Sequence, residues 1–290
     1  MRLTHDRAIV GMVAATLMWS TAGVVTRHLE NAARFEITFW RSFFTVLSLL
    51  VMLPLFQGRQ VFARMARAGR SLWLSGLCWS VMFTAFMVAL TMTSVANVLV
   101  TMALGPLLTA LIARLVIGYR IPARTWGAIA VAGGGIAWMY GHQIAGGRIA
   151  GTLVALCVPF AAAINWTVNQ RSQARGENVD LVPAVLVGAV VSSLATLPLA
   201  LPFTATPRDL GLLGFLGLVQ LAIPCALAVM CARVLKAPEM SLLALLEVIF
   251  GILLAWLGAG EVPRITVLTG GALVLGALVT NELIGWRQRT

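Results

Sequence analysis

The sequence predicts an all-α integral membrane protein with ten transmembrane helices, arranged as two inverted five-helix repeats around a central cavity. Three observations predict this fold: a strongly apolar composition, ten apolar runs of membrane-spanning length, and an internal repeat. Of the 290 residues, 60% are hydrophobic and 11% are charged, and the mean hydropathy is +0.92. Soluble domains average about 25% charged residues. A chain of this composition therefore needs lipid as its solvent.

Each of the ten apolar runs can cross a bilayer, because a spanning helix needs roughly 20 apolar residues. The segments between the runs are short, so we expect no soluble domain. The first run lacks a clear small-residue cleavage site and leads directly into Arg27 and His28. It is therefore expected to remain as a span and not to be removed as a signal peptide. The ten runs are 8–26, 36–56, 72–91, 95–116, 123–140, 150–169, 181–201, 210–232, 239–257 and 265–284.

The distribution of positive charge predicts the orientation of the chain. If the N-terminus is cytoplasmic, 15 of the 21 Lys and Arg residues fall on the cytoplasmic side and 5 on the other side, with Arg41 inside a span. This bias follows the positive-inside rule, so both termini are expected in the cytoplasm. The formal net charge of +11 then needs no nucleic-acid partner, because the excess charge contacts anionic lipid head groups.

An internal repeat divides the chain into 1–142 and 143–290. A shift of 142 residues places Gly118 on Gly260 and Gly134 on Gly276, and each matched stretch is a span, a Gly- and Pro-containing turn and a glycine-rich span. Each half holds five spans. Because five is odd, the halves are expected to lie upside down relative to each other. Inverted repeats are typical of secondary transporters, with the substrate site near the midplane. The alternative is chance similarity between two hydrophobic segments.

Several motifs of other membrane proteins are missing from the sequence. The only lysine, Lys236, does not belong to a phosphate-binding loop, so ATP is not an expected partner. The histidines His5, His28 and His142 lie at span ends or in loops, which excludes an HExxH zinc site. The four cysteines lie inside spans without metal-site spacing. We therefore expect neither an enzyme nor a cofactor or metal, and a channel is disfavoured because no ring of charge or filter-like loop occurs.

Three segments resemble one known family. They are Thr-Phe-Trp-Arg-Ser at 38–42, Pro-Leu-Leu-Thr-Ala at 106–110, and the turn Gly260-Glu261. Their order and spacing resemble the drug/metabolite transporter superfamily in its ten-helix EamA type, over nearly the whole chain as two tandem units. The sequence departs from the family pattern at Tyr119, where a glutamate is usual, and at Val248, where proline is common.

The resemblance implies a multi-pass exporter of amino acids, drugs or other metabolites in the bacterial inner membrane. The aromatic-rich interior is most similar to YddG-like exporters of aromatic and other neutral amino acids. Drug efflux or nucleotide-sugar-like cargo is the alternative within transport, and a lipid flippase or membrane scaffold is the alternative outside it. Direction of flux, coupling ion and oligomeric state are left open.

Polar and aromatic side chains inside the spans are the candidate substrate-binding residues, because such groups usually face a bundle interior or a wet cavity. Asn97 and Thr101 share one helix face, and the shift of 142 places Gly105, one turn further, on Glu247 of the ninth span. Together the candidates predict an apolar, aromatic cavity with a few amide and hydroxyl groups, suited to a neutral zwitterion with an apolar side chain. They are Trp19, Ser20, Trp79, Met82, Phe83, Phe86, Asn97, Thr101, Asn165, Trp166, Asn169, Gln220 and Glu247.

Each candidate also has a structural interpretation. The aromatic side chains can pack or face lipid, and the amides and hydroxyls can join helices by hydrogen bonds. Arg41 lies only about a turn inside its span and can snorkel to the interface, so a structural role is expected for it, and Glu261 is expected to serve in a turn and cap. Glu247 loses hydration at its depth in the span, so it is the one candidate for proton coupling, although a bracing role is favoured.

Glycines concentrated in the fifth and tenth spans predict a close-packed seam between these two helices. Pro106, Pro159 and Pro224 lie inside apolar runs and predict interrupted, flexible helices, because proline removes a backbone donor.

Overall fold

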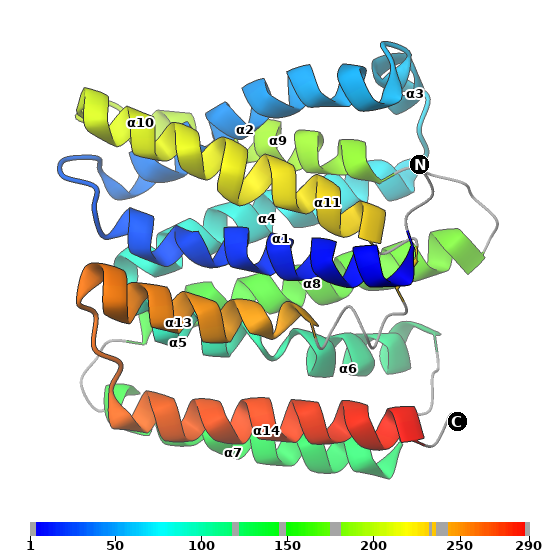
Figure 1. The fold of residues 1–290 in the computed structure, drawn as a ribbon, viewed down its shortest axis with the longest axis vertical. Helices are drawn as coiled ribbons and strands as arrows, with labels where there is room; N and C mark the ends of the chain where they lie inside the picture. Colours follow the sequence, from blue (N-terminus) through cyan, green and yellow to red (C-terminus); the bar gives the residue numbers. More distant parts are fainter. Residues whose placement is uncertain are drawn as a thin grey trace.

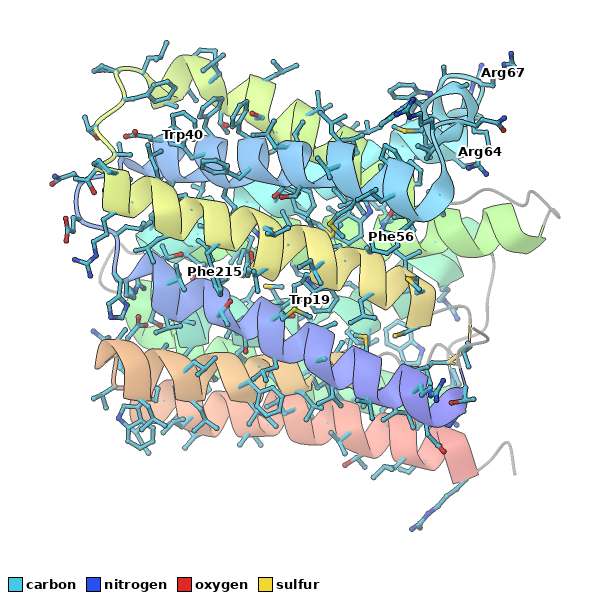
Figure 2. All side chains as sticks on the ribbon, turned by 45° about the horizontal axis from the view of Figure 1, so that its top comes forward. Trp19, Trp40, Phe56, Arg64, Arg67 and Phe215 are labelled. Carbon is cyan, nitrogen blue, oxygen red and sulfur yellow. The ribbon has the colours of Figure 1, made fainter. Side chains whose placement is uncertain are left out.

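We describe the protein from a computed structural model, which covers residues 4–117, 122–144, 149–174, 181–231, 234–235 and 243–287. All regular structure in these ranges is helical, as the composition predicts. Most of the helices run roughly parallel or antiparallel to one another, and both ends of the chain lie at the same end of the bundle (Figure 1). Arg64 and Arg67, on a short helix, also lie at that end (Figure 2).

The helices follow the predicted apolar runs. Within the described residues, seven stretches are long and apolar enough to cross a membrane, and two further apolar helices, Ala150–Asn165 and Leu246–Ala259, are shorter. The count of ten spans therefore stays a prediction. The elements are α1 His5–Thr26, α2 Arg34–Gln57, α3 Val61–Ala66, α4 Arg70–Met92, α5 Val95–Met102, α6 Gly105–Ile117, α7 Ala123–Ile144, α8 Ala150–Ala174, α9 Val182–Ala200, α10 Pro207–Phe215, the π-helix η1 Leu216–Ala222, α11 Ile223–Cys231, α13 Leu246–Ala259 and α14 Ile265–Arg287.

Helices of the first half pack mainly on helices of the second. α4 packs on α8 and α9, α2 on α9 and η1, and α1 on α13 and α11. The pair α7 and α14 forms a separate layer at one edge of the bundle (Figure 1). At Gly135 of α7, an added Cβ would lie 2.8 Å from the carbonyl oxygen of Gly270 in α14, so only glycine permits this approach. The predicted glycine seam is confirmed.

The three prolines singled out in the sequence act differently from one another. Pro159 lies inside the continuous helix α8, so the interruption predicted there is wrong. Pro224 is the second residue after η1. It has no N–H for the carbonyl of Gln220, and its ring would clash with that carbonyl in a regular helix. The chain widens instead, and the N–H of Ile223 donates to the carbonyl of Leu218 five residues earlier.

Two helix breaks occur at corresponding positions of the two halves. The first separates α5 from α6 at Ala103 and Leu104, and Pro106 is the second residue of α6. The second lies at Leu245, directly before α13, and the shift of 142 residues places Ala103 on Leu245. Interrupted helices at matching positions of two repeats often mark the binding site of a transporter.

Candidate functional site

A buried arginine joins several of the predicted residues. Arg41 of α2 is only 2% exposed. Its Nε donates to Oε1 of Gln220 at 3.0 Å, and its Nη1 is 3.5 Å from the carbonyl oxygen of Phe83. The expectation that Arg41 snorkels to the interface is wrong. α2 begins at Arg34, which puts Arg41 roughly 10 Å inside the helix, and Gln220 holds its head group in the interior.

The aromatic stripe of α4 surrounds this arginine. The Arg41 guanidinium carbon lies 5.9 Å from the ring centroid of Phe83 and 5.6 Å from that of Phe86, within cation–π range. Trp79 lies next along the stripe, with its ring 5.4 Å from that of Phe83. Met82, on the same helix, is 9% exposed. The predicted stripe therefore supplies an apolar and aromatic wall beside a buried positive charge.

Gln220 connects α2 to α1 through the π-helix. Its Oε1 accepts from Arg41, and its Nε2 is 3.3 Å from the carbonyl oxygen of Trp19. Trp19 lies where α1 meets the rod formed by α10, η1 and α11 (Figure 2). Gly217 lets η1 approach α2, because an added Cβ would lie 2.9 Å from the carbonyl oxygen of Arg41. The Thr45 hydroxyl bridges the carbonyls of Arg41 and Gly217 at 2.8 and 3.1 Å.

Glu247 lies in the first turn of α13 and interacts electrostatically with Arg41. Among the described residues, no ion pair within 4 Å joins the two and no hydrogen bond reaches the Glu247 carboxylate. The side chain of Glu247 is half-buried. The sequence favoured a bracing role for Glu247. Among the described residues, no hydrogen bond to its carboxylate supports that role.

The other predicted residues with described side chains make hydrogen bonds that do not involve Arg41. The Ser20 hydroxyl donates to Leu17 of its own helix at 2.7 Å. Asn165 accepts from Ser75 at 2.6 Å and so joins α8 to α4. The side chains of Trp166 and Asn169 lie outside the described residues.

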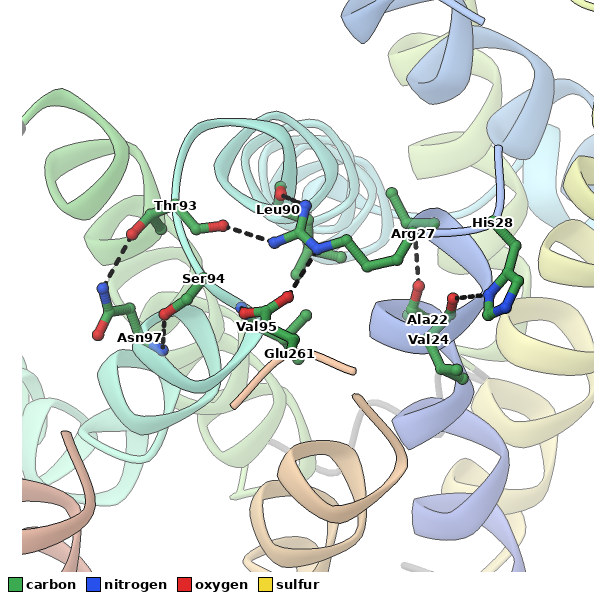
Figure 3. Close-up of polar contacts among 11 residues, drawn as sticks. Ala22, Val24, Arg27, His28, Leu90, Thr93, Ser94, Val95, Asn97 and Glu261 are labelled. Atoms are coloured by element: carbon green, nitrogen blue, oxygen red, sulfur yellow. Dashed lines mark hydrogen bonds and ion pairs between the residues drawn. The ribbon is translucent and has the colours of Figure 1, made fainter. Parts of the chain in front are cut away.

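Asn97 lies near the end of the bundle opposite the termini, and Thr101 lies one turn further along α5. Asn97 Nδ2 donates to the hydroxyl of Thr93 at 2.9 Å (Figure 3), and the Thr101 hydroxyl donates to the carbonyl of Asn97 at 2.7 Å. Thr93 follows the last residue of α4, so Asn97 lies near a helix junction.

An ion pair closes that same end of the bundle (Figure 3). Nε of Arg27, at the end of α1, lies 2.7 Å from Oε2 of Glu261 in the turn between α13 and α14. The other two guanidinium nitrogens of Arg27 donate to the carbonyls of Leu90 and Thr93, both at 2.9 Å. The second oxygen of Glu261 accepts from the N–H of Val95 at 2.8 Å. Glu261 thus does more than end a turn, because it ties together α1, the α4–α5 junction and the α13–α14 turn.

A second polar cluster fastens the neighbouring loops. The carboxylate of Glu36, fully buried, accepts from the N–H groups of Thr204 and Ala205 and from the Thr204 hydroxyl. Asp209, also buried, accepts from the backbone N–H groups of residues 30 and 31 at 2.8 and 3.1 Å. Both clusters lie at the end opposite the termini, so polar contacts join the loops there, and those of Glu36 and Asp209 are buried while the Arg27–Glu261 pair is partly exposed.

A groove of about 450 Å³ lies between α7 and α14, away from Arg41. Small apolar side chains dominate it, and none of the predicted substrate-binding residues contributes to it, so we do not place the substrate there. It is lined by Arg124, Gly127, Ala128, Val131, Ala272, Leu273, Gly276, Ala277, Thr280, Asn281 and Ile284.

Comparison with known families identifies the fold. A model described as the EamA-like transporter family matches residues 6–141 and, a second time, residues 149–281. The chain belongs to the EamA-like transporter family. Two tandem EamA matches account for a two-repeat membrane transporter fold, and they confirm the family resemblance of the sequence motifs. EamA proteins transport small solutes across a membrane, and this chain shares that general role.

Solved structures share the fold of this chain. Nineteen solved chains match this chain. One of them, described only as a crystal structure of a protein, is 18% identical in sequence and superposes with a TM-score of 0.62, covering 97% of this chain and 99% of its own. No curated protein matches the chain. The likeness at this identity concerns the fold alone.

Proposed function

We propose that this EamA protein is a secondary transporter that exports small neutral metabolites, above all aromatic and other neutral amino acids, by alternating access. The observation that carries the proposal is the buried Arg41–Gln220 pair against the rings of Phe83 and Phe86. A polar group able to bind a charged head, next to aromatic surface able to pack an apolar side chain, suits an amino acid with a large side chain.

The polar contacts at the end opposite the termini support a state in which the transport pathway is closed to the outside. With both termini in the cytoplasm of a bacterial inner membrane, as the charge bias favours, the Arg27–Glu261 and Glu36–Thr204 contacts face outward. An exporter must break such contacts to release its cargo, and must re-form them before it returns.

Three elements have the local geometry to bend during this cycle. They are the π-helix η1 before Pro224, the break between α5 and α6, and the break before α13. None of them keeps an uninterrupted ladder of i to i−4 hydrogen bonds, and bending there needs fewer bonds to break than bending within a regular helix.

The test is counterflow into proteoliposomes of the purified protein. Liposomes preloaded with unlabelled L-phenylalanine are expected to accumulate labelled L-phenylalanine, and the Phe83→Ala variant is expected to exchange it at least several-fold more slowly. Phe56→Ala is the matched control, because Phe56 is 79% exposed and Phe83 is 3% exposed.

Other results would favour the alternatives. Exchange of a drug-like cation without exchange of any amino acid would point to drug efflux. Scrambling of a fluorescent phospholipid by the reconstituted protein would point to a flippase. Equal exchange of L-phenylalanine by wild type and Phe83→Ala would show that the aromatic side chains of α4 do not bind the cargo.

A further inference from the structure

We propose that Arg41 and Glu247 bind opposite ends of the cargo: the Arg41 guanidinium takes a carboxylate and the Glu247 carboxylate takes an ammonium group. The inference rests on the proposed function and narrows its cargo to small zwitterions that carry both charges. Arg41 is a residue for which sequence reasoning expected only an interfacial position.

Arg41 retains donors for a ligand. A guanidinium has five N–H donors. In Arg41, Nε donates to the side-chain oxygen of Gln220 at 3.0 Å, and Nη1 makes a long contact of 3.5 Å with the carbonyl oxygen of Phe83. The planar fork of arginine matches the two oxygens of a carboxylate. Burying a charge without an ion pair is unfavourable, and ionisable groups retained inside membrane proteins usually mark the path of a substrate or ion. A cargo carboxylate would supply the missing negative partner.

Glu247 offers the complementary charge in the same interior. Its carboxylate interacts with Arg41 electrostatically, but the two groups lie more than 4 Å apart in N–O distance. Arg41 is held by Gln220 and by the two phenylalanine rings, and α13 sets the backbone position of Glu247. The two charges are therefore held apart and do not neutralise each other directly. A zwitterion between them, with its carboxylate toward Arg41 and its ammonium group toward Glu247, would pair with both charges.

Neighbouring groups leave this assignment intact. Cys225 is the other titratable group that interacts with both Arg41 and Glu247, and its thiol is 1% exposed. A thiol is a weak hydrogen-bonding group without charge, so it does not replace either end of a zwitterion. The rings of Trp79 and Phe83 continue the wall away from Arg41 and supply apolar surface for the cargo side chain.

The first experiment varies the ligand and leaves the protein unchanged. Thermal unfolding of the detergent-solubilised protein is measured with L-phenylalanine, its amide, 3-phenylpropanoate and phenethylamine, which share one apolar side chain. A ligand that binds the folded state raises the unfolding temperature. L-phenylalanine is expected to bind at least about tenfold more tightly than the three analogues, since each lacks one charged partner. Equal stabilisation by L-phenylalanine and its amide would overturn the proposal, and so would the absence of stabilisation by every carboxylate.

The second experiment assigns each charge to its residue. Arg41→Lys keeps the charge but loses the fork, so binding of L-phenylalanine and 3-phenylpropanoate is expected to weaken about tenfold while binding of phenethylamine is unchanged. Glu247→Gln is expected to bind L-phenylalanine no better than 3-phenylpropanoate. Arg208→Lys and Glu30→Gln are the matched controls, because Arg208 and Glu30 form an exposed ion pair.

The outcomes separate this inference from the proposed function. If the protein exchanges L-phenylalanine and its amide equally well, the proposed function stands, but the roles of Arg41 and Glu247 are overturned. Charge-dependent binding without exchange would support the two roles and count against transport. If Arg41→Lys does not fold, the Glu247→Gln variant and the ligand series measured on the wild type still test the proposal.

Discussion

At the scale of single residues, the neighbours of Arg41 hold its side chain in place. The side chain of Gln220 accepts from its Nε, and two phenylalanine rings lie within cation–π distance of it. These contacts replace part of the hydration that the guanidinium loses on burial. The position of Arg41 therefore depends on how closely η1 approaches α2, which depends in turn on Gly217.

Gly217→Ala is expected to separate η1 from α2. A Cβ at this position would lie 2.6 Å from the Cβ of Phe44 and 2.9 Å from the carbonyl oxygen of Arg41, and neither atom can move away cheaply. Overpacking of this kind costs about 1–3 kcal/mol. The unfolding temperature in detergent and the exchange of L-phenylalanine should both fall.

Gly211→Ala is the control for this substitution. Gly211 lies on α10 of the same rod and has open space where a Cβ would be placed. Alanine there should leave exchange unchanged and stability equal or slightly higher, because alanine favours helix more than glycine does. If both variants behave alike, the close approach at Gly217 has no part in holding Arg41.

At the scale of whole elements, the irregular helices carry the site. η1 presents Gln220 to α2 and α1, and α13 begins one residue before Glu247. A regular helix through 207–231 would change the direction in which Gln220 points, because a π-turn adds one residue to the turn.

Pro224→Ala is expected to lower exchange without lowering stability. Alanine supplies the N–H that proline lacks, so the regular bond from residue 224 to the carbonyl of Gln220 can form and η1 can tighten to an α-helix. Gln220 then turns away from Arg41. The measurement compares exchange rate with unfolding temperature, and an exchange rate equal to that of wild type would show that η1 does not position Gln220.

Pro159→Ala serves as the control for the proline substitution. Pro159 lies in the continuous helix α8, where no π-turn precedes it. Its replacement should leave exchange unchanged.

The helices were predictable from the sequence because apolar runs of spanning length leave little choice in a bilayer. The short helix α3 was missed, since its six residues include Arg64 and form no apolar run. α8 stays continuous through Pro159, because neighbouring helices can satisfy the backbone group that a proline leaves free.

The site was predictable in part. Phe83, Phe86 and Gln220 stand out as aromatic or polar residues inside apolar runs, and the structure brings them together. Arg41 was missed because a long basic side chain near the end of a span usually reaches the interface. The signal that could have found it is the rule that an ionisable residue within a span marks function by default. Asn97 lies near the junction of α4 and α5, where it bonds Thr93 four residues earlier.

At the scale of the whole molecule, each half of the chain is packed on the other. α1 lies on α13, α4 on α8 and α9, and α7 on α14. The polar clusters at the end opposite the termini join loops from both halves, since Arg27 bonds Glu261 and Glu36 bonds Thr204. Opening that end requires the halves to separate there.

Glu261→Gln is expected to loosen the closed end. The variant loses the charge that pairs with Arg27, a pair only partly exposed and therefore only partly screened. The buried thiol of Cys225 reports the opening. In a background that lacks the other three cysteines, a membrane-impermeant maleimide should label Cys225 faster in the variant.

Glu30→Gln is the control, because its ion pair with Arg208 is more exposed. Equal labelling of Cys225 in wild type and Glu261→Gln would show that the Arg27–Glu261 pair does not hold the exit shut.

The orientation of the chain has a direct test. The excess of positive charge at one end predicts that both termini are cytoplasmic. A fluorescent protein fused to the C-terminus should therefore fluoresce, and alkaline phosphatase fused there should be inactive. Active phosphatase would contradict the predicted orientation and, with a cytoplasmic N-terminus, the ten-span count.

The opposite charges of Arg41 and Glu247 have a consequence for energetics. Moving one elementary charge through a membrane voltage of 100 mV is worth about 2.3 kcal/mol. The cargo proposed for this protein has no net charge, and the charges of Arg41 and Glu247 compensate each other within the carrier. The electric field across the membrane then does almost no work on the loaded protein. Export should proceed at the same rate in energised and de-energised vesicles, and the concentration difference of the cargo alone should set its direction.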